Sequence, residues 1–182
     1  MYAYEQAGIV PDVLVLSKAI GGGLPMSVVV YNKSLDEWQP GAHAGTFRGN
    51  QLAMAAGTAT IDYIRTYRLD LHADKMGKRL MAMLRKTQIA HPHIGDVRGR
   101  GLMIGVEIVN TDLSSNTLGA YPADRELASQ IQAECLRRGL IVELGGRKGS
   151  VVRFLPPLII TSDEVDQVGQ IFNDALNALT YG

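Results

Sequence analysis

Short apolar runs alternate with longer amphipathic stretches along this chain. The first two runs, at residues 13–16 and 28–31, flank a turn rich in glycine and proline. Apolar runs of this length, bounded by turn residues, predict β-strands, and we interpret the first run as a short buried strand. Later runs predict strands at residues 102–109, 140–144 and 151–154. The apolar pattern therefore places one pair of strands near the start of the chain and the other strands in its second half.

The stretches between these strands have the spacing of amphipathic helices. Asn50 is a suitable N-cap for a helix that ends near residue 65. Helical periodicity continues over residues 69–89 and 123–138. Residues 161–164 have the Thr-x-x-Glu pattern of a capping box and precede a last amphipathic helix. The elements follow in the order β-β-α-α-β-α-β-β-α, which predicts an α/β protein.

Composition excludes several classes of partner. The chain's 182 residues carry 18 basic and 18 acidic side chains, so its formal net charge is zero. A neutral chain has no basic field to attract nucleic acid, and we interpret Arg-Gly-Arg-Gly at residues 98–101 as a solvated turn. No apolar run approaches a membrane span, and residues 1–12 lack the pattern of a signal peptide. The single cysteine, Cys135, excludes an internal disulfide. We expect a cytoplasmic protein with no nucleic-acid or membrane partner.

Lys18 is the strongest candidate for a reactive residue, because it lies where the first strand opens into Gly21, Gly22 and Gly23. Glycine lets the backbone approach a neighbour or a ligand closely, and an amine buried there loses water. Loss of water favours the neutral amine, a nucleophile that condenses with carbonyl groups. A solvated lysine without function is the alternative from these residues alone. The glycines lack the G-x-G-x-x-G spacing of a dinucleotide site.

Two further side chains are candidates for binding. Thr46 follows Gly45 and precedes a predicted helix start, where a hydroxyl can donate to a phosphate oxygen. Arg153 lies inside the apolar run at residues 151–157, where an unpaired charge is costly and a guanidinium suits a carboxylate. The alternatives are an ordinary loop threonine and, for Arg153, either a strand arginine whose charged end reaches solvent or an internal ion pair. His43 is assigned no role, and we find no histidine or cysteine group with metal-ligand spacing.

Three segments of the chain resemble those of one enzyme family. They are LSKAIGGGLP at residues 16–25, GAHAGTFRGNQLA at residues 41–53 and VVRFLPPL at residues 151–158. In order and spacing they are similar to class III, or omega, aminotransferases, which are pyridoxal-5'-phosphate enzymes of fold type I, the aspartate-aminotransferase fold. The resemblance covers the whole chain but only the C-terminal portion of a family member. The family's glycine-rich phosphate turn, ring-stacking aromatic and pyridine-pairing aspartate have no counterpart here, so we expect a fragment, a truncated chain or a degenerate copy.

The resemblance implies a role for each of the three candidates. Lys18 would be the catalytic residue, bonded covalently to pyridoxal 5'-phosphate and moving a proton once the substrate amine displaces it. Thr46 would bind the phosphate of the cofactor in the neighbouring subunit, which implies a homodimer with sites at its interface. Arg153 would bind the α-carboxylate of 2-oxoglutarate or glutamate.

The resemblance also predicts the domains and the substrate. Residues 1–68 would be the end of the large pyridoxal-phosphate-binding domain, and residues 69–182 the small C-terminal domain. Residues 43–50 and 139–147 are similar to those of family members that transfer the terminal amine of L-2,4-diaminobutyrate to 2-oxoglutarate, giving aspartate 4-semialdehyde and glutamate. The alternatives are an ornithine or acetylornithine aminotransferase, and an inactive fragment that acts only as an association module.

Overall fold

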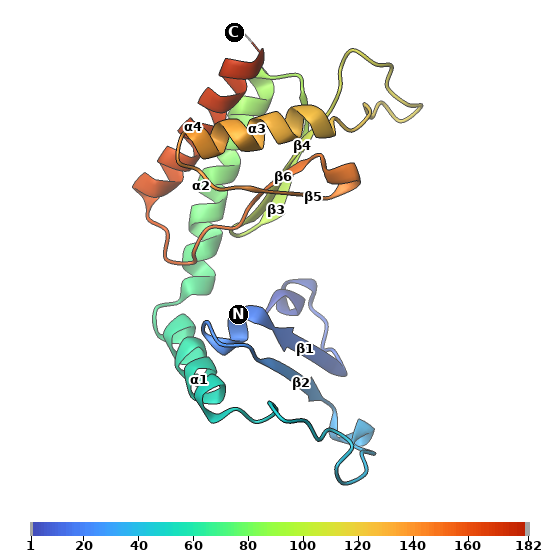
Figure 1. The fold of residues 1–182 in the computed structure, drawn as a ribbon, viewed down its shortest axis with the longest axis vertical. Helices are drawn as coiled ribbons and strands as arrows, with labels where there is room; N and C mark the ends of the chain where they lie inside the picture. Colours follow the sequence, from blue (N-terminus) through green and yellow to red (C-terminus); the bar gives the residue numbers. More distant parts are fainter. Residues whose placement is uncertain (1, 181–182) are drawn as a thin grey trace. The chain divides into compact units, whose positions relative to one another are not determined.

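The first part of the fold is a small unit built on two strands. The computed structural model describes residues 2–180, and the chain divides into two compact units, Met1–Asp70 and Leu71–Gly182. In the first unit, β1 (Val13–Ser17) and β2 (Ser27–Tyr31) form an antiparallel two-stranded sheet, as Figure 1 shows. Both strands were predicted from their apolar runs, and the structure confirms them.

Helix α1 (Gln51–Thr66) completes the first unit. Its predicted N-cap is confirmed: the Asn50 side chain accepts hydrogen bonds from the backbone N–H groups of Leu52 and Ala53, at 3.0 and 3.2 Å. Short 3₁₀ turns cover the rest of the regular structure in this unit; they are η1 (Ala3–Ala7), η2 (Lys18–Gly21) and η3 (Lys33–Leu35).

The structure corrects the expectation that β1 is a buried strand. Side chains alternate along β1, so that Val13 and Val15 are 48% and 67% exposed while Leu14 and Leu16 are half-buried. A run of four apolar residues does not reveal how many faces of its strand are covered. In this unit only one face of β1 is shielded, because the sheet has two strands and no second layer over the valines.

The second unit is a four-stranded sheet packed against helices. The strands are β3 (Ile94–Arg100), β4 (Met103–Ile108), β5 (Glu143–Gly145) and β6 (Val151–Phe154), in the order β3-β4-β6-β5 with every neighbouring pair antiparallel. The helices are α2 (Leu69–Ala90), α3 (Arg125–Arg137) and α4 (Ser162–Thr180), and a 3₁₀ turn, η4 (Arg147–Gly149), joins β5 to β6. The α/β prediction is confirmed.

One face of this sheet forms the core with the three helices. Ile104 from β4 and Phe154 from β6 belong to the same buried cluster as Leu80 from α2, Ile131 from α3 and Phe172 from α4. The two phenylalanine rings meet edge to face, with centroids 5.3 Å apart. Because side chains alternate along strands, the residues between these core positions lie on the opposite face of the sheet, which is the more open of the two although Val151 is buried there.

Strand β3 was not predicted from the sequence. Residues 98–101 were expected to form a solvated turn, and no strand was predicted between residues 89 and 102. In the structure Gly95 lies within β3, and Arg98 pairs with Gly105 of β4. Only two residues of β3 are buried, Ile94 and Val97, so its apolar signal is too sparse for periodicity to detect.

The two compact units divide between Asp70 and Leu71, in the first turn of α2. That these units correspond to the large and small domains of a bigger enzyme, with a boundary between residues 68 and 69, stays a prediction. Among residues 2–180, no helix combines the length and the apolar character needed to cross a bilayer.

Candidate functional site

Lys18 has an unusual backbone conformation. It begins η2 directly after β1 and has φ 57°, in the left-handed region. A residue with a Cβ atom loses about 1–2 kcal/mol there. Arg68 and Lys148 are also left-handed, but the first follows the end of α1 and the second lies in the β5–β6 turn, where this conformation is common. Lys18 instead joins a strand to a 3₁₀ turn, and strain of this kind concentrates at functional positions.

Helix α1 holds the Lys18 turn in place. A Cβ atom at Gly57 would lie 2.5 Å from the carbonyl oxygen of Ile20, so the turn rests directly on the helix backbone. Gly22, also left-handed, lies against Ala56 in the same way. The small residues of α1 therefore act as a flat support. Because the helix is rigid, the support sets the direction in which the Lys18 side chain leaves the strand.

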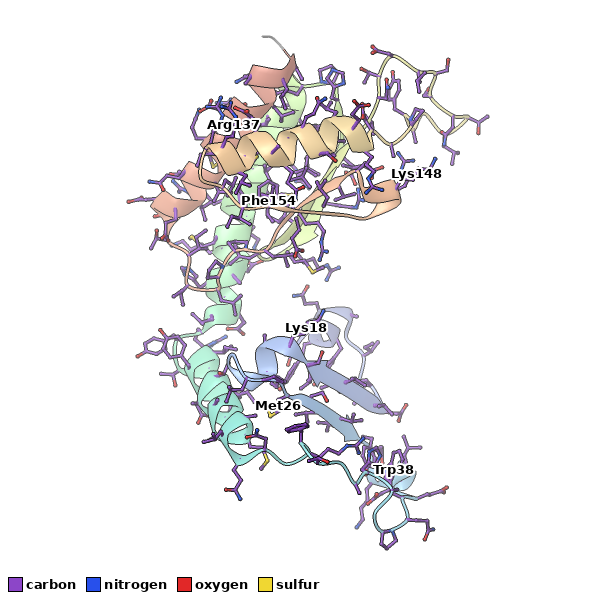
Figure 2. All side chains as sticks on the ribbon, in the orientation of Figure 1. Lys18, Met26, Trp38, Arg137, Lys148 and Phe154 are labelled. Atoms are coloured by element: carbon purple, nitrogen blue, oxygen red, sulfur yellow. The ribbon has the colours of Figure 1, made fainter. Side chains whose placement is uncertain are left out.

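The Lys18 amine is exposed, which corrects the expectation that this site is dry within the chain. Figure 2 shows Lys18 where β1 gives way to the turn. Among the described residues, no hydrogen bond or ion pair engages its Nζ atom. Desolvation of the Lys18 amine would require a covered outer face on β1. That face is not covered, because Val15 on it is exposed. What the chain provides is an amine that leaves a turn of defined backbone conformation and whose nitrogen has no partner among residues 2–180.

Thr46 lies in the loop between β2 and α1, four residues before the Asn50 cap. Its side chain is exposed, and within residues 2–180 no partner is recorded for its hydroxyl. A hydroxyl in this state can donate to an anion. Lys18 and Thr46 both belong to the first unit, and Arg153 belongs to the second.

Arg153 lies on the open face of the second unit's sheet. Its neighbours Val152 and Phe154 point into the core, so alternation directs the arginine outward, with 37% of its side chain exposed. The expectation that its charge is buried in an apolar run is therefore wrong. Its cross-strand partner is Glu143 of β5, and Arg153 Nη1 lies 3.5 Å from Glu143 Oε2. The ion-pair alternative is thus observed, in a loose and exposed form.

The contacts of Glu143 and Gly145 with Arg153 were missed in the sequence analysis. A Cβ atom at Gly145 would lie 2.8 Å from Arg153 Cδ, so this glycine leaves room for the arginine stem. Glu143 lies in the strand predicted at residues 140–144, and Gly145 directly follows that range; in the structure both belong to β5. The sequence did contain a signal for these contacts, because the strands predicted at residues 140–144 and 151–154 flank a glycine-rich turn and can pair as a hairpin. The register of that pairing decides which side chains face each other.

Two neighbouring arginines are more firmly engaged than Arg153. Glu107 forms an ion pair with each of them. Its Oε2 atom lies 2.8 Å from Arg98 Nη1, and its Oε1 atom lies 2.8 Å from Arg147 Nη2. Asp96 also accepts from Arg98, and these carboxylates together raise the pKa of that guanidinium. Compared with these two, Arg153 has a single long contact. It is therefore the arginine best able to exchange its partner for a substrate carboxylate.

An enzyme that acts on amino and keto acids can use a lysine amine without a partner and an arginine that can bind a carboxylate. Comparison with known families agrees: the model of the family Aminotransferase class-III matches residues 1–176. The chain belongs to the class III aminotransferases. The fold described above is that of the C-terminal portion of a pyridoxal-phosphate-dependent aminotransferase.

Similar proteins include two enzymes named diaminobutyrate–2-oxoglutarate aminotransferase. The one from Rhizobium meliloti is 56% identical over 92% of this chain, and the one from Haemophilus influenzae is 46% identical over 97%. The chain spans 36% and 39% of these relatives' lengths. The ornithine aminotransferase of Toxoplasma gondii, solved with partial occupancy of PLP at its active site, superposes with TM-score 0.83 at 26% identity, over 98% of this chain and 40% of that one.

Proposed function

We propose that this chain supplies the attachment lysine and the carboxylate-binding arginine of a pyridoxal-phosphate-dependent aminotransferase. The enzyme transfers the terminal amine of L-2,4-diaminobutyrate to 2-oxoglutarate, and the products are aspartate 4-semialdehyde and glutamate. The observation that carries the proposal is the strained, unoccupied Lys18 on its α1 support, in a chain of this family. The two relatives at 56% and 46% identity favour diaminobutyrate over ornithine as the donor.

The residues present fit the cofactor. Lys18 Nζ has no partner among residues 2–180 and is the group that would hold the cofactor by its aldehyde carbon. A Cβ atom at Gly23, in the turn that follows Lys18, would meet nothing within 4 Å, so a group can approach the backbone of this turn closely. Thr46 offers a hydroxyl for a phosphate oxygen. When bound, pyridoxal phosphate supplies the electron sink that makes the substrate C–H bond acidic.

Each proposed residue then has a defined task. Lys18 Nζ, as a free amine, would take the proton from the substrate carbon that carries the amine and deliver it to the aldehyde carbon of the cofactor; in the second half of the reaction it would move a proton the opposite way, onto the carbon of 2-oxoglutarate that gains the amine. Arg153 leaves Glu143 and binds the α-carboxylate of 2-oxoglutarate through two parallel N–H groups. We assign Thr46 to the phosphate bound in a second subunit, so the enzyme is a homodimer in this proposal.

An association module is the second candidate for the isolated chain. Large apolar side chains of the first unit are exposed, including Val10 at 92% and Phe47 at 88%. Such surface favours contact with further protein. This reading and the enzymatic one are compatible if the surface is covered in the complete enzyme. We place that enzyme in the cytoplasm, a reducing compartment in which a free, buried thiol such as that of Cys135 is stable.

Reductive labelling tests the lysine assignment. The chain is mixed with pyridoxal phosphate, reduced with borohydride and mapped by mass spectrometry, and we expect the adduct on Lys18. Lys148 is the matched control, because it is also an exposed lysine with a left-handed backbone. Lys18→Ala should abolish the labelling and Lys148→Ala should preserve it. Equal labelling of both lysines would refute the assignment.

Donor preference tests the substrate assignment. The complete enzyme that contains these residues is supplied with 2-oxoglutarate and with L-2,4-diaminobutyrate, ornithine or acetylornithine. We expect the largest kcat/KM with diaminobutyrate. A larger value with either other donor would contradict the substrate proposal and leave the lysine assignment intact.

A further inference from the structure

The loop that carries Thr46 is closed by one arginine. Arg48 Nη1 lies 2.6 Å from the carbonyl oxygen of His43 and 2.6 Å from the Nδ1 atom of the same residue. An arginine only donates, so His43 Nδ1 must accept, and the ring proton is on Nε2. These two bonds tie together the ends of a six-residue segment, residues 43–48, whose interior holds Gly45, Thr46 and Phe47.

The segment is compact as well as closed. A backbone bond from Arg48 N–H to the Gly45 carbonyl, at 3.1 Å, forms a turn with Thr46 and Phe47 at its centre. A Cβ atom at Gly45 would lie 3.1 Å from both Arg48 Cδ and Arg48 Nε, so the arginine side chain lies directly over that glycine. Thr46 is therefore presented at the tip of a turn whose two sides are fixed by Arg48.

An aromatic chain connects this turn to the sheet. The His43 ring meets Trp38 edge to face at a centroid distance of 4.0 Å, and Trp38 meets Tyr31 at 6.3 Å. Tyr31 ends β2, and its hydroxyl donates to Asp36 at 3.0 Å. Figure 2 labels Trp38 in this loop. Through these ring contacts, the irregular loop that contains His43 packs against the end of β2.

We propose that Arg48 and His43 are positioning residues for Thr46, which they hold in the geometry needed to reach the cofactor phosphate. The inference rests on the proposed function, in which Thr46 binds that phosphate. Arg48 acts through the loop: its Nη1 group is committed to His43, and Thr46 has an unoccupied hydroxyl. Without the arginine the turn opens, and the hydroxyl must be ordered again when the cofactor binds.

A double-mutant cycle in the complete enzyme tests this inference. Cofactor affinity is measured for the parent, Thr46→Val, Arg48→Ala and the double variant, each with pyridoxal phosphate and with pyridoxal, which has no phosphate. We expect each single change to weaken pyridoxal phosphate binding about tenfold, the double variant to be little worse than either, and pyridoxal binding to stay constant. Arg48→Lys should recover only part of the loss, because an ammonium has no planar fork.

The outcomes separate this inference from the proposed function. Additive losses would overturn it, because Arg48 would then act independently of Thr46. Unchanged affinity in Arg48→Ala together with a loss in Thr46→Val would also overturn it and leave the phosphate role of Thr46 standing. Unchanged affinity in Thr46→Val would refute the phosphate role itself. Equal losses of affinity for pyridoxal and for pyridoxal phosphate in Arg48→Ala would also overturn the inference, because Arg48 would then have only a general structural role.

Discussion

Replacing Lys18 by glycine should give a more stable protein than replacing it by alanine. Both changes remove the amine. Alanine keeps a Cβ atom in the left-handed backbone at φ 57°, and glycine does not. The comparison therefore isolates the strain at this position from the loss of the lysine side chain.

The size of the difference follows from two opposing effects. A left-handed backbone costs a residue with a Cβ atom about 1–2 kcal/mol, and glycine avoids that cost. The greater freedom of glycine in the unfolded chain costs about 0.5–1 kcal/mol relative to alanine. At the midpoints of these two ranges, Lys18→Gly should therefore be more stable than Lys18→Ala by roughly 0.75 kcal/mol. At Ala19, which does not share the positive φ of Lys18, the sign reverses, and Ala19→Gly should be less stable than the parent.

Tryptophan fluorescence during urea unfolding is a suitable assay. The chain has one tryptophan, Trp38, and it lies in the same compact unit as Lys18, so its signal reports on the unit that is changed. Midpoints are compared for Lys18→Gly, Lys18→Ala and Ala19→Gly at constant slope. If Lys18→Ala equals or exceeds Lys18→Gly, the backbone is not strained there, and the structural argument for Lys18 loses its basis.

Three other predictions concern the second unit. Phe172→Ala should lower the free energy of unfolding by about 3–5 kcal/mol, because the ring is fully buried. Leu136 is exposed, so Leu136→Ala should change that free energy by less than about 0.5 kcal/mol. Both are measured by circular dichroism during unfolding, and a similar loss for the two variants would contradict the described core. Burial lowers the pKa of His91, so the unfolded chain takes up the proton first as pH falls below about 6.5, and stability should decrease there. His91→Gln should flatten that decrease in urea midpoints between neutral and acidic pH, and an unchanged slope would exclude His91 as its source. In the complete enzyme, Arg153→Lys should raise the KM for 2-oxoglutarate about tenfold, because an ammonium cannot form the bidentate contact with a carboxylate. The KM for the amine donor should change little. Equal changes in the two KM values would argue against the carboxylate role of Arg153.

Local signals were sufficient to predict most helices and strands. Asn50 caps α1 through bonds to the next residues, and the Thr161–Glu164 capping box forms as expected, with Glu164 Oε2 accepting from Thr161 N–H at 2.8 Å. An i,i+4 ion pair in α3 is likewise local, with Arg138 Nε 2.9 Å from Glu134 Oε1. These interactions span four residues or fewer, so the amino-acid sequence by itself determines them.

The environment of each candidate residue was decided by tertiary structure. Whether Lys18 is covered depends on the layers around β1, and the partner of Arg153 depends on the register of β5 and β6. The bond from Arg48 to His43 depends on how an irregular loop turns back on itself. Burial, cross-strand pairing and loop closure join atoms whose separation along the chain does not reveal their separation in space, and so these features emerged only once the chain was folded.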